Sequence, residues 1–197
     1  NGNKEIEEWF QNDILGRDGD LPAVVYYYED EKKKSEMWFT DEKLSRVSED
    51  GKVILPATIH YYQNGNKASE SYYKNGSLYR DDDLPSIVEY YYNENGNGKI
   101  ETETWYDDGY IHRENGPAII SYFKYENKEN KNNNKKSEKW YKKGENYREP
   151  KIEPTGEIVY LPSIIHYYKN GNKEEDVWTD EHGNTHRVNG PAIITYF

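Results

Sequence analysis

Apolar and polar residues alternate in the short segment that follows each of six prolines. One residue after the proline the side chain is small, three residues after it is Val or Ile, and five residues after it is Tyr. Successive side chains of a β-strand point to opposite faces of a sheet, so these three positions share one face. We therefore expect the tyrosines to be largely buried on one side of a sheet. They are Tyr27, Tyr61, Tyr90, Tyr122, Tyr167 and Tyr196.

The residue four positions after each proline lies in the opposite phase and varies from one segment to the next. We expect this row to face solvent. In a repeat protein the residues fixed in every unit serve the stack, so specificity has to come from the positions that vary. Ser121 and Thr195 occupy two of these positions. The candidate binding residues are the other four, Tyr26, His60, Glu89 and His166.

A second pattern precedes each of these strands, in which an aromatic residue is followed eight or nine residues later by Arg, as at Trp105 and Arg113. The dipeptide Asp108-Gly109 lies between them, and such dipeptides are the strongest short signal for a β-hairpin. A two-residue turn there pairs Trp105 with His112. Arg113 is then diagonal to Tyr106 on the opposite face, where its guanidinium group could stack on the tyrosine ring.

Both patterns occur six times, so the chain is a repeat protein. The predicted fold is all-β: an elongated, single-layer array of stacked antiparallel β-hairpins in one domain, in which each unit completes the core of its neighbour. Because the opening sequence Asn1-Gly2-Asn3-Lys4 recurs as an internal turn at Asn64–Lys67, we expect these residues to be a segment of a longer array. The predicted repeats are roughly residues 1–28, 29–62, 63–92, 93–123, 124–168 and 169–197.

Differences in repeat length are confined to insertions. Lys124–Lys136 is rich in Asn and Lys, a composition typical of a solvated loop tip. Val47–Leu55 and Glu149–Leu161 separate the Arg from the Pro in the second and fifth repeats, and a strand with His at its outward position follows each of them. We infer that these two repeats are sister units, whose loops and histidines form equivalent contact surfaces.

The composition indicates what fills the core. Only 34% of the residues are hydrophobic and 32% are charged, a balance usual in disordered chains, but 21 Tyr and 5 Trp argue against disorder. We expect the aromatic side chains to form the core. A formal net charge of −11 disfavours nucleic acid and anionic membranes as partners. The chain has no Cys for a disulfide or thiolate metal site, and no apolar run long enough to insert into a membrane.

The segment Trp105–Tyr122 resembles a MORN-type repeat, in the divergent form frequent in large DNA viruses of protists and in related bacterial repeat proteins. The family's aromatic residue, turn glycine, histidine, second glycine and tyrosine are matched by Trp105, Gly109, His112, Gly116 and Tyr122. Arg113 stands where the family usually has Gly, and Pro-Ala replaces a later glycine. The resemblance covers all six units. It implies an elongated meander of β-hairpins that contacts proteins or lipids, and it leaves the virion and the host cytoplasm open as compartments.

Repeated acidic residues are the most prominent candidates for chemistry. One stands two positions before each aromatic anchor, and such an array could bind a metal ion or act in acid–base catalysis. We favour pairing with Lys or Arg across the ladder, since like charges directly opposite each other would destabilise wrong registers. The acidic residues are Glu7, Glu36, Glu70, Glu103, Glu138 and Asp176.

Asp180, His182 and His186 have a spacing that a metal ion could use, but they lie in a polar turn that no other repeat shares. His112 and His186 are better interpreted as ring partners of the tryptophans opposite them. Every distinctive residue recurs at structural spacing, whereas catalysis usually needs one asymmetric site. We therefore predict no enzyme activity, no metal and no cofactor.

Aromatic rows could also stack on sugar rings, as in the aromatic hairpin repeats of cell-wall and toxin carbohydrate-binding modules, which the chain resembles in composition. We favour a core of aromatic residues, because a chain this polar has little else to bury. The predicted function is a non-enzymatic scaffold or protein–protein interaction module, and by the resemblance a viral structural component. Its expected partners are proteins, other copies of the chain or capsid components. The alternative, a carbohydrate-binding module, requires exposed rings.

Overall fold

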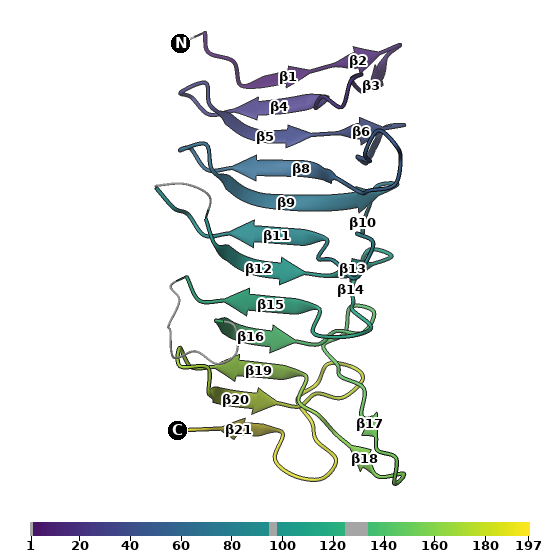
Figure 1. The fold of residues 1–197 in the computed structure, drawn as a ribbon, viewed down its shortest axis with the longest axis vertical. Coiled ribbons are helices and arrows are strands. Elements are labelled where there is room, and N and C mark those ends of the chain that lie inside the picture. Colours follow the sequence, from purple (N-terminus) through teal and green to yellow (C-terminus); the bar gives the residue numbers. More distant parts are fainter. Residues whose placement is uncertain (1, 95–97, 125–133) are drawn as a thin grey trace. The chain divides into compact units, whose positions relative to one another are not determined.

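The computed structural model describes residues 2–94, 98–124 and 134–197 (Figure 1). These residues form strands, turns and connecting segments, and no helix occurs among them. Their contacts divide the chain into two compact units, Asn1–Glu101 and Thr102–Phe197. Within each unit consecutive main strands pair antiparallel, which confirms the prediction of an all-β meander of hairpins.

The main sheet of the first unit alternates strands that lead into or contain an aromatic anchor with strands that begin at or after a proline. Each pairs with the next one in the order β1 (Ile6–Glu8), β4 (Val24–Tyr27), β5 (Lys33–Met37), β8 (Pro56–Tyr61), β9 (Lys67–Lys74) and β11 (Ile87–Tyr90). The short strand β10 (Ser77–Leu78) folds back on the end of β9.

The main sheet of the second unit repeats this alternation. Its strands pair in the order β12 (Ile100–Thr104), β15 (Ile119–Tyr122), β16 (Lys135–Lys139), β19 (Ile164–Tyr167), β20 (Lys173–Val177) and β21 (Ile193–Thr195). In β12, residues 102–104 make the pairs with β15. Both sheets therefore bring together side chains that recur once in each repeat.

Small hairpins follow the aromatic anchors. They pair β2 (Phe10–Gln11) with β3 (Ile14–Leu15), β6 (Phe39–Thr40) with β7 (Lys43–Leu44), and β13 (Tyr106–Asp107) with β14 (Tyr110–Ile111). The predicted turn is confirmed at Asp108 and Gly109, where φ is 47° and 81°, the left-handed region that a type I′ turn requires. The N–H of His112 donates to the carbonyl oxygen of Trp105 at 3.1 Å, so the predicted register is confirmed too.

The insertions of the second and fifth repeats also fold as hairpins. Val47 and Ile54 form a β-bridge, and β17 (Lys151–Ile152) pairs with β18 (Ile158–Val159). Residues 125–133 of the predicted loop Lys124–Lys136 lie outside the described residues. The C-terminal boundary of that loop was wrong, because its last two residues begin β16 and Lys135 pairs with Tyr122.

Aromatic anchors form the core, as the composition predicts. Trp38, Tyr72, Trp105 and Trp178 each expose only 6–7% of their surface. The small residues that follow the prolines are almost fully buried on the same face, and they are Ala23, Ala57, Ser86, Ala118 and Ser163. The stacking partner that we predicted for Arg113 was wrong. Its guanidinium carbon lies 3.9 Å from the ring centroid of Trp105 rather than over Tyr106, and the larger indole is the stronger cation–π partner.

The tyrosines five residues after each proline are half-buried rather than largely buried. In each unit the main strands form a single sheet (Figure 1), so their rings lie against neighbouring side chains of that same sheet. Their hydroxyl groups reach carboxylates on the preceding strand, as at Tyr61 and Glu36. The predicted face was correct, but the predicted depth of burial was not.

Candidate functional site

The repeated carboxylates sit at the centre of a three-residue cluster that recurs along the sheet. In the second repeat Tyr61 donates from its hydroxyl to Glu36 Oε2 at 2.5 Å, and Lys33 donates from Nζ to Glu36 Oε1 at 2.5 Å. The Glu36 side chain is only 9% exposed. The same Tyr–acid–Lys cluster is formed around Glu7, Glu70, Glu138 and Asp176.

Sheet register explains why the acid and the tyrosine meet. The residue directly opposite each carboxylate is Val or Ile, for example Val25 opposite Glu36 and Ile59 on its other side. The tyrosine stands two residues beyond Ile59 on the same face, where its long ring brings the hydroxyl back to the acid. Glu103 likewise accepts a hydrogen bond from Tyr122 at 2.5 Å.

The electrostatics of the cluster favour the neutral form of the tyrosine. The hydrogen bond to Glu7 raises the pKa of the Tyr27 hydroxyl to about 12. Burial, followed by the hydrogen bond to the acid, raises the pKa of Tyr61 and of its counterparts Tyr90, Tyr122 and Tyr167. Hydrogen bonds from Lys4 and then Tyr27 lower the pKa of Glu7. The predicted pairing of the acids with Lys is confirmed, but the lysine lies three residues earlier on the same strand, and the cross-strand partner is a tyrosine that we did not predict.

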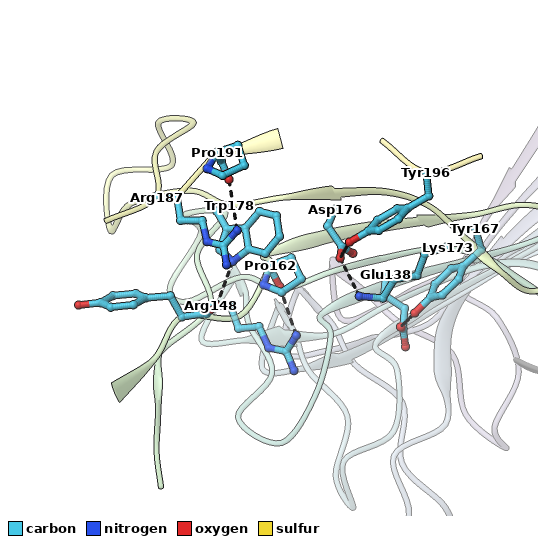
Figure 2. Close-up of polar contacts among 11 residues, drawn as sticks. Glu138, Arg148, Pro162, Tyr167, Lys173, Asp176, Trp178, Arg187, Pro191 and Tyr196 are labelled. Atoms are coloured by element: carbon cyan, nitrogen blue, oxygen red, sulfur yellow. Dashed lines mark hydrogen bonds and ion pairs between the residues drawn. The ribbon is translucent and has the colours of Figure 1, made fainter. Parts of the chain in front are cut away.

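Asp176 departs from this pattern because its side chain is one methylene shorter. Figure 2 shows Lys173 and Tyr196 converging on Asp176, and both bond its Oδ2 atom, at 2.7 and 2.9 Å. Its buried Oδ1 atom has no hydrogen-bond partner. Glu138 and Tyr167 lie in the same view, and Glu138 Oε2 accepts the tyrosine hydroxyl at 2.5 Å. The other oxygen of Glu138 accepts from Lys135 at 2.6 Å.

Arginines cover the aromatic anchors. In every repeat the guanidinium carbon lies 3.7–4.0 Å from the ring centroid, and the pairs are Arg17–Trp9, Arg46–Trp38, Arg80–Tyr72, Arg113–Trp105, Arg148–Trp140 and Arg187–Trp178. Figure 2 shows Arg187 on Trp178, with Arg187 Nη1 also donating to the Pro191 carbonyl oxygen at 3.4 Å. One face of each anchor ring is thereby covered by a guanidinium group.

The predicted binding residues lie on the other face. In the first unit Tyr26, His60 and Glu89 belong to one row across the sheet, separated by Ser35 and Ser69. All three are exposed, as expected for the row that faces solvent. Partial desolvation of the ring by its neighbours, followed by the charge of nearby Lys34, lowers the pKa of His60.

His166 occupies the corresponding row of the second unit. It lies between Ser137 and Glu175, and the row continues through Ser121 on one side and Thr195 on the other. His166 and Ser121 are half-buried and Thr195 is exposed. In each unit the variable positions are therefore aligned in one row across the strands, with the buried Ser35 or Ser137 between two of them.

A hydrogen bond that we did not predict from the sequence links successive repeats. Six residues after each proline the chain always has Tyr or Phe. The hydroxyl of Tyr28 donates to the carbonyl oxygen of Tyr61 at 2.7 Å, and Tyr62 and Tyr168 make the same bond to Tyr90 and Tyr196. These aromatics tie one proline-following strand to the next across the strand between them.

The candidate metal ligands in the last repeat organise a turn. Asp180 Oδ1 accepts hydrogen bonds from the backbone N–H of Asn184 at 2.9 Å and of His182 at 3.0 Å, and these bonds lower the pKa of Asp180. The N–H of His186 donates to the Trp178 carbonyl oxygen. In the part of the chain that the structure describes, no group of three or more His, Asp or Glu side chains is placed to hold a metal ion.

Comparison with known proteins adds no relative: no family model, curated protein or solved structure matches the chain. Among the described residues there is no helix long and apolar enough to cross a membrane.

Proposed function

We propose that this chain is a non-enzymatic scaffold of MORN-type repeats that binds proteins through the strip of variable residues on one face of its sheets. The resemblance to repeats of large DNA viruses supports a role as a structural component of a virus particle, with other copies or capsid components among the partners. No catalytic residue, metal or cofactor enters this proposal.

One observation carries it: the repeated acids and aromatic anchors lie on one face, and the positions that vary between repeats lie on the other. The repeated acids are bonded to Tyr and Lys, and the aromatic anchors are covered by Arg. Tyr26, His60 and Glu89 occupy equivalent positions of three repeats, differ in type, and face solvent in one row. A row with a different exposed side chain at every second strand is suited to specific recognition of a protein surface.

The same geometry disfavours a carbohydrate-binding module. Such a module offers exposed aromatic faces to sugar rings, whereas Trp38 and Trp178 are buried beneath guanidinium groups. Their indole N–H groups are engaged as well, donating to the carbonyl oxygens of Asp20 and Tyr160 at 3.1 Å. Glycans screened by quenching of tryptophan fluorescence provide the counter-test, and saturable quenching by one glycan would favour the alternative.

Site-specific photo-crosslinking tests the proposal. Benzoylphenylalanine is placed at Tyr26, His60 or Glu89, and at Ile14 as a matched position that is also exposed but lies in a side hairpin. We expect the row positions, and not Ile14, to crosslink one protein from the native source, with the product competed away by unmodified chain. Equal labelling from all four positions, or crosslinks from Ile14 alone, would contradict the proposed surface.

A further inference from the structure

The insertion of the fifth repeat is longer than closing the repeat requires. Three residues join Arg113 to Pro117, whereas thirteen join Arg148 to Pro162. Both arginines nevertheless reach the carbonyl oxygen of their proline through Nη1, at 3.4 and 3.2 Å. The extra residues therefore serve something other than the geometry of the repeat.

These extra residues form an amphipathic hairpin. Ile152 lies directly opposite Ile158, and Lys151 opposite Val159. The turn is closed by the N–H of Glu153, which donates to the carbonyl oxygen of Glu157 at 2.9 Å. Because side chains alternate between faces, Ile152, Ile158 and Tyr160 share one face, while Lys151, Glu153, Glu157 and the half-buried Val159 share the other.

The apolar face of this hairpin is open to solvent. Ile152 is 71% exposed, Ile158 53% and Tyr160 37%. Figure 1 shows β17 and β18 lying off the main strands of their unit rather than on them. The base of the hairpin is fixed, since the carbonyl oxygen of Tyr160 accepts the indole N–H of the buried Trp178.

Exposed isoleucines contribute little to the stability of so short a hairpin. A two-stranded ribbon is marginal in water unless one face packs on something, and this one presents its apolar face outward. The insertion of the fourth hairpin turn, residues 124–134, differs in composition, being mostly Asn, Lys and Glu. Apolar side chains rimmed by polar groups are typical of a protein interface.

We propose that the apolar face of the β17–β18 hairpin docks a protein partner whose own apolar patch is edged by Lys or Arg. Acidic groups give the hairpin its charge: Glu149 is paired with Lys142 and Glu153 with Lys151 at 2.9 Å, while Glu157 forms no ion pair among the described residues. A second copy of this chain, with its formal net charge of −11, would bring like charges together. The inference rests on the proposed function, for which it names the chemistry of the partner.

The sister insertion has related features. Val47 and Val53 are exposed in the hairpin of the second repeat, and Glu49 and Asp50 lie at its tip. Ile54, the partner of Val47 in the β-bridge, is buried and anchors that hairpin. The two insertions therefore present the same combination of β-branched side chains and acidic groups.

Alternating synthetic peptides test the inference on the intact chain. The probe is a capped Leu-Lys repeat peptide, with a Leu-Glu peptide matched in apolar content and a Ser-Lys peptide matched in charge. Binding is followed by amide NMR shifts and by anisotropy of labelled peptide. We expect the Leu-Lys peptide to bind at least about tenfold more tightly than either control and to shift resonances of residues 149–160, because only it offers both apolar area and positive charge.

Two sets of variants locate the contact. Ile152→Thr with Ile158→Thr keeps both residues β-branched and should weaken Leu-Lys binding about tenfold, from the apolar area lost. Val188→Thr is the control, being 56% exposed in the same unit but outside the hairpin, and should change affinity less than about twofold. Glu157→Gln leaves the isoleucines intact and should weaken binding with a smaller dependence on salt.

Three outcomes would overturn the inference: equal binding of the Leu-Glu peptide, equal loss in the Val188→Thr control, or a wild-type dimer that the isoleucine variant dissociates. The last would show that a second copy covers the face. Failure of the proposed function has a different signature. If the row positions still crosslink a protein while peptide binding ignores the hairpin, only the inference fails. If glycans bind and no position crosslinks a protein, the proposed function fails.

Discussion

Substituting Tyr61→Phe removes one hydrogen bond from the Tyr–acid–Lys cluster of the second repeat and leaves the aromatic ring in place. The lost bond joins the Tyr61 hydroxyl to Glu36 Oε2 at 2.5 Å. Glu36 is buried, and its remaining partner Lys33 already bonds the other oxygen. Hydrogen bonds to charged groups contribute about 1.5–3 kcal/mol, so we expect the free energy of unfolding to fall by about 2 kcal/mol.

The control is Tyr26→Phe, which removes a hydroxyl from the opposite, exposed face of the same sheet and should change stability by less than about 0.5 kcal/mol. Urea unfolding with amide hydrogen exchange in β5 and β8 measures the loss where it arises, and β19 and β20 serve as an internal reference. A double-mutant cycle with Glu36→Gln then isolates the coupling. If Tyr61→Phe were no more costly than Tyr26→Phe, the cluster would contribute nothing to stability and the reasoning would be refuted.

Three further predictions follow from the same contacts. Asp176→Glu should raise the free energy of unfolding by about 1 kcal/mol in urea, since a longer side chain can give Lys173 and Tyr196 separate oxygens, and a loss would show that the site cannot accept the extra methylene. The pKa of Tyr27 is raised to about 12, and the pKa values of the tyrosines in the other clusters are raised too. Their contribution to stability is therefore complete below the unfolded pKa of about 10 and is lost as pH rises through the folded values. Unfolding followed by tyrosinate absorbance should show stability falling above pH about 10, and a flat profile would contradict the raised pKa values. Deleting residues 125–133 should leave stability nearly unchanged, whereas replacing all of Lys124–Lys136 by Asn-Gly-Asn should cost more in a thermal unfolding scan, because it removes the Lys135 partner of Glu138.

Much of the fold could be predicted because the informative signals are local. Asp108-Gly109 specifies a two-residue turn by its backbone preference alone, and that turn fixes the pairing of Trp105 with His112. Alternation after the prolines specifies which residues share a face. The partner of Arg113 could not be derived in this way, because its side chain reaches over Trp105 from the loop before Pro117 rather than from a paired strand.

The candidate site was predictable only in part. That Tyr26, His60 and Glu89 face outward follows from alternation, but that they form one row with Ser35 and Ser69 depends on the register between separate hairpins. Predicting the hydrogen-bond partners of the acids also requires the register between separate hairpins. The spacing of Lys33 and Glu36 is visible in the sequence, yet the tyrosine that completes the cluster is contributed by another strand.

The central claim is that the variable row, and not the repeated face, binds the partner. Tyr26→Ser, His60→Ser and Glu89→Ser, made together, convert the row of the first unit into continuous serine and leave the acid clusters untouched. The most direct measurement is the affinity of this variant for the protein recovered by crosslinking, beside that of Tyr61→Phe on the opposite face. The account predicts that the triple variant loses at least about tenfold in affinity while Tyr61→Phe binds normally. Normal binding by the triple variant, with loss in Tyr61→Phe, would contradict it.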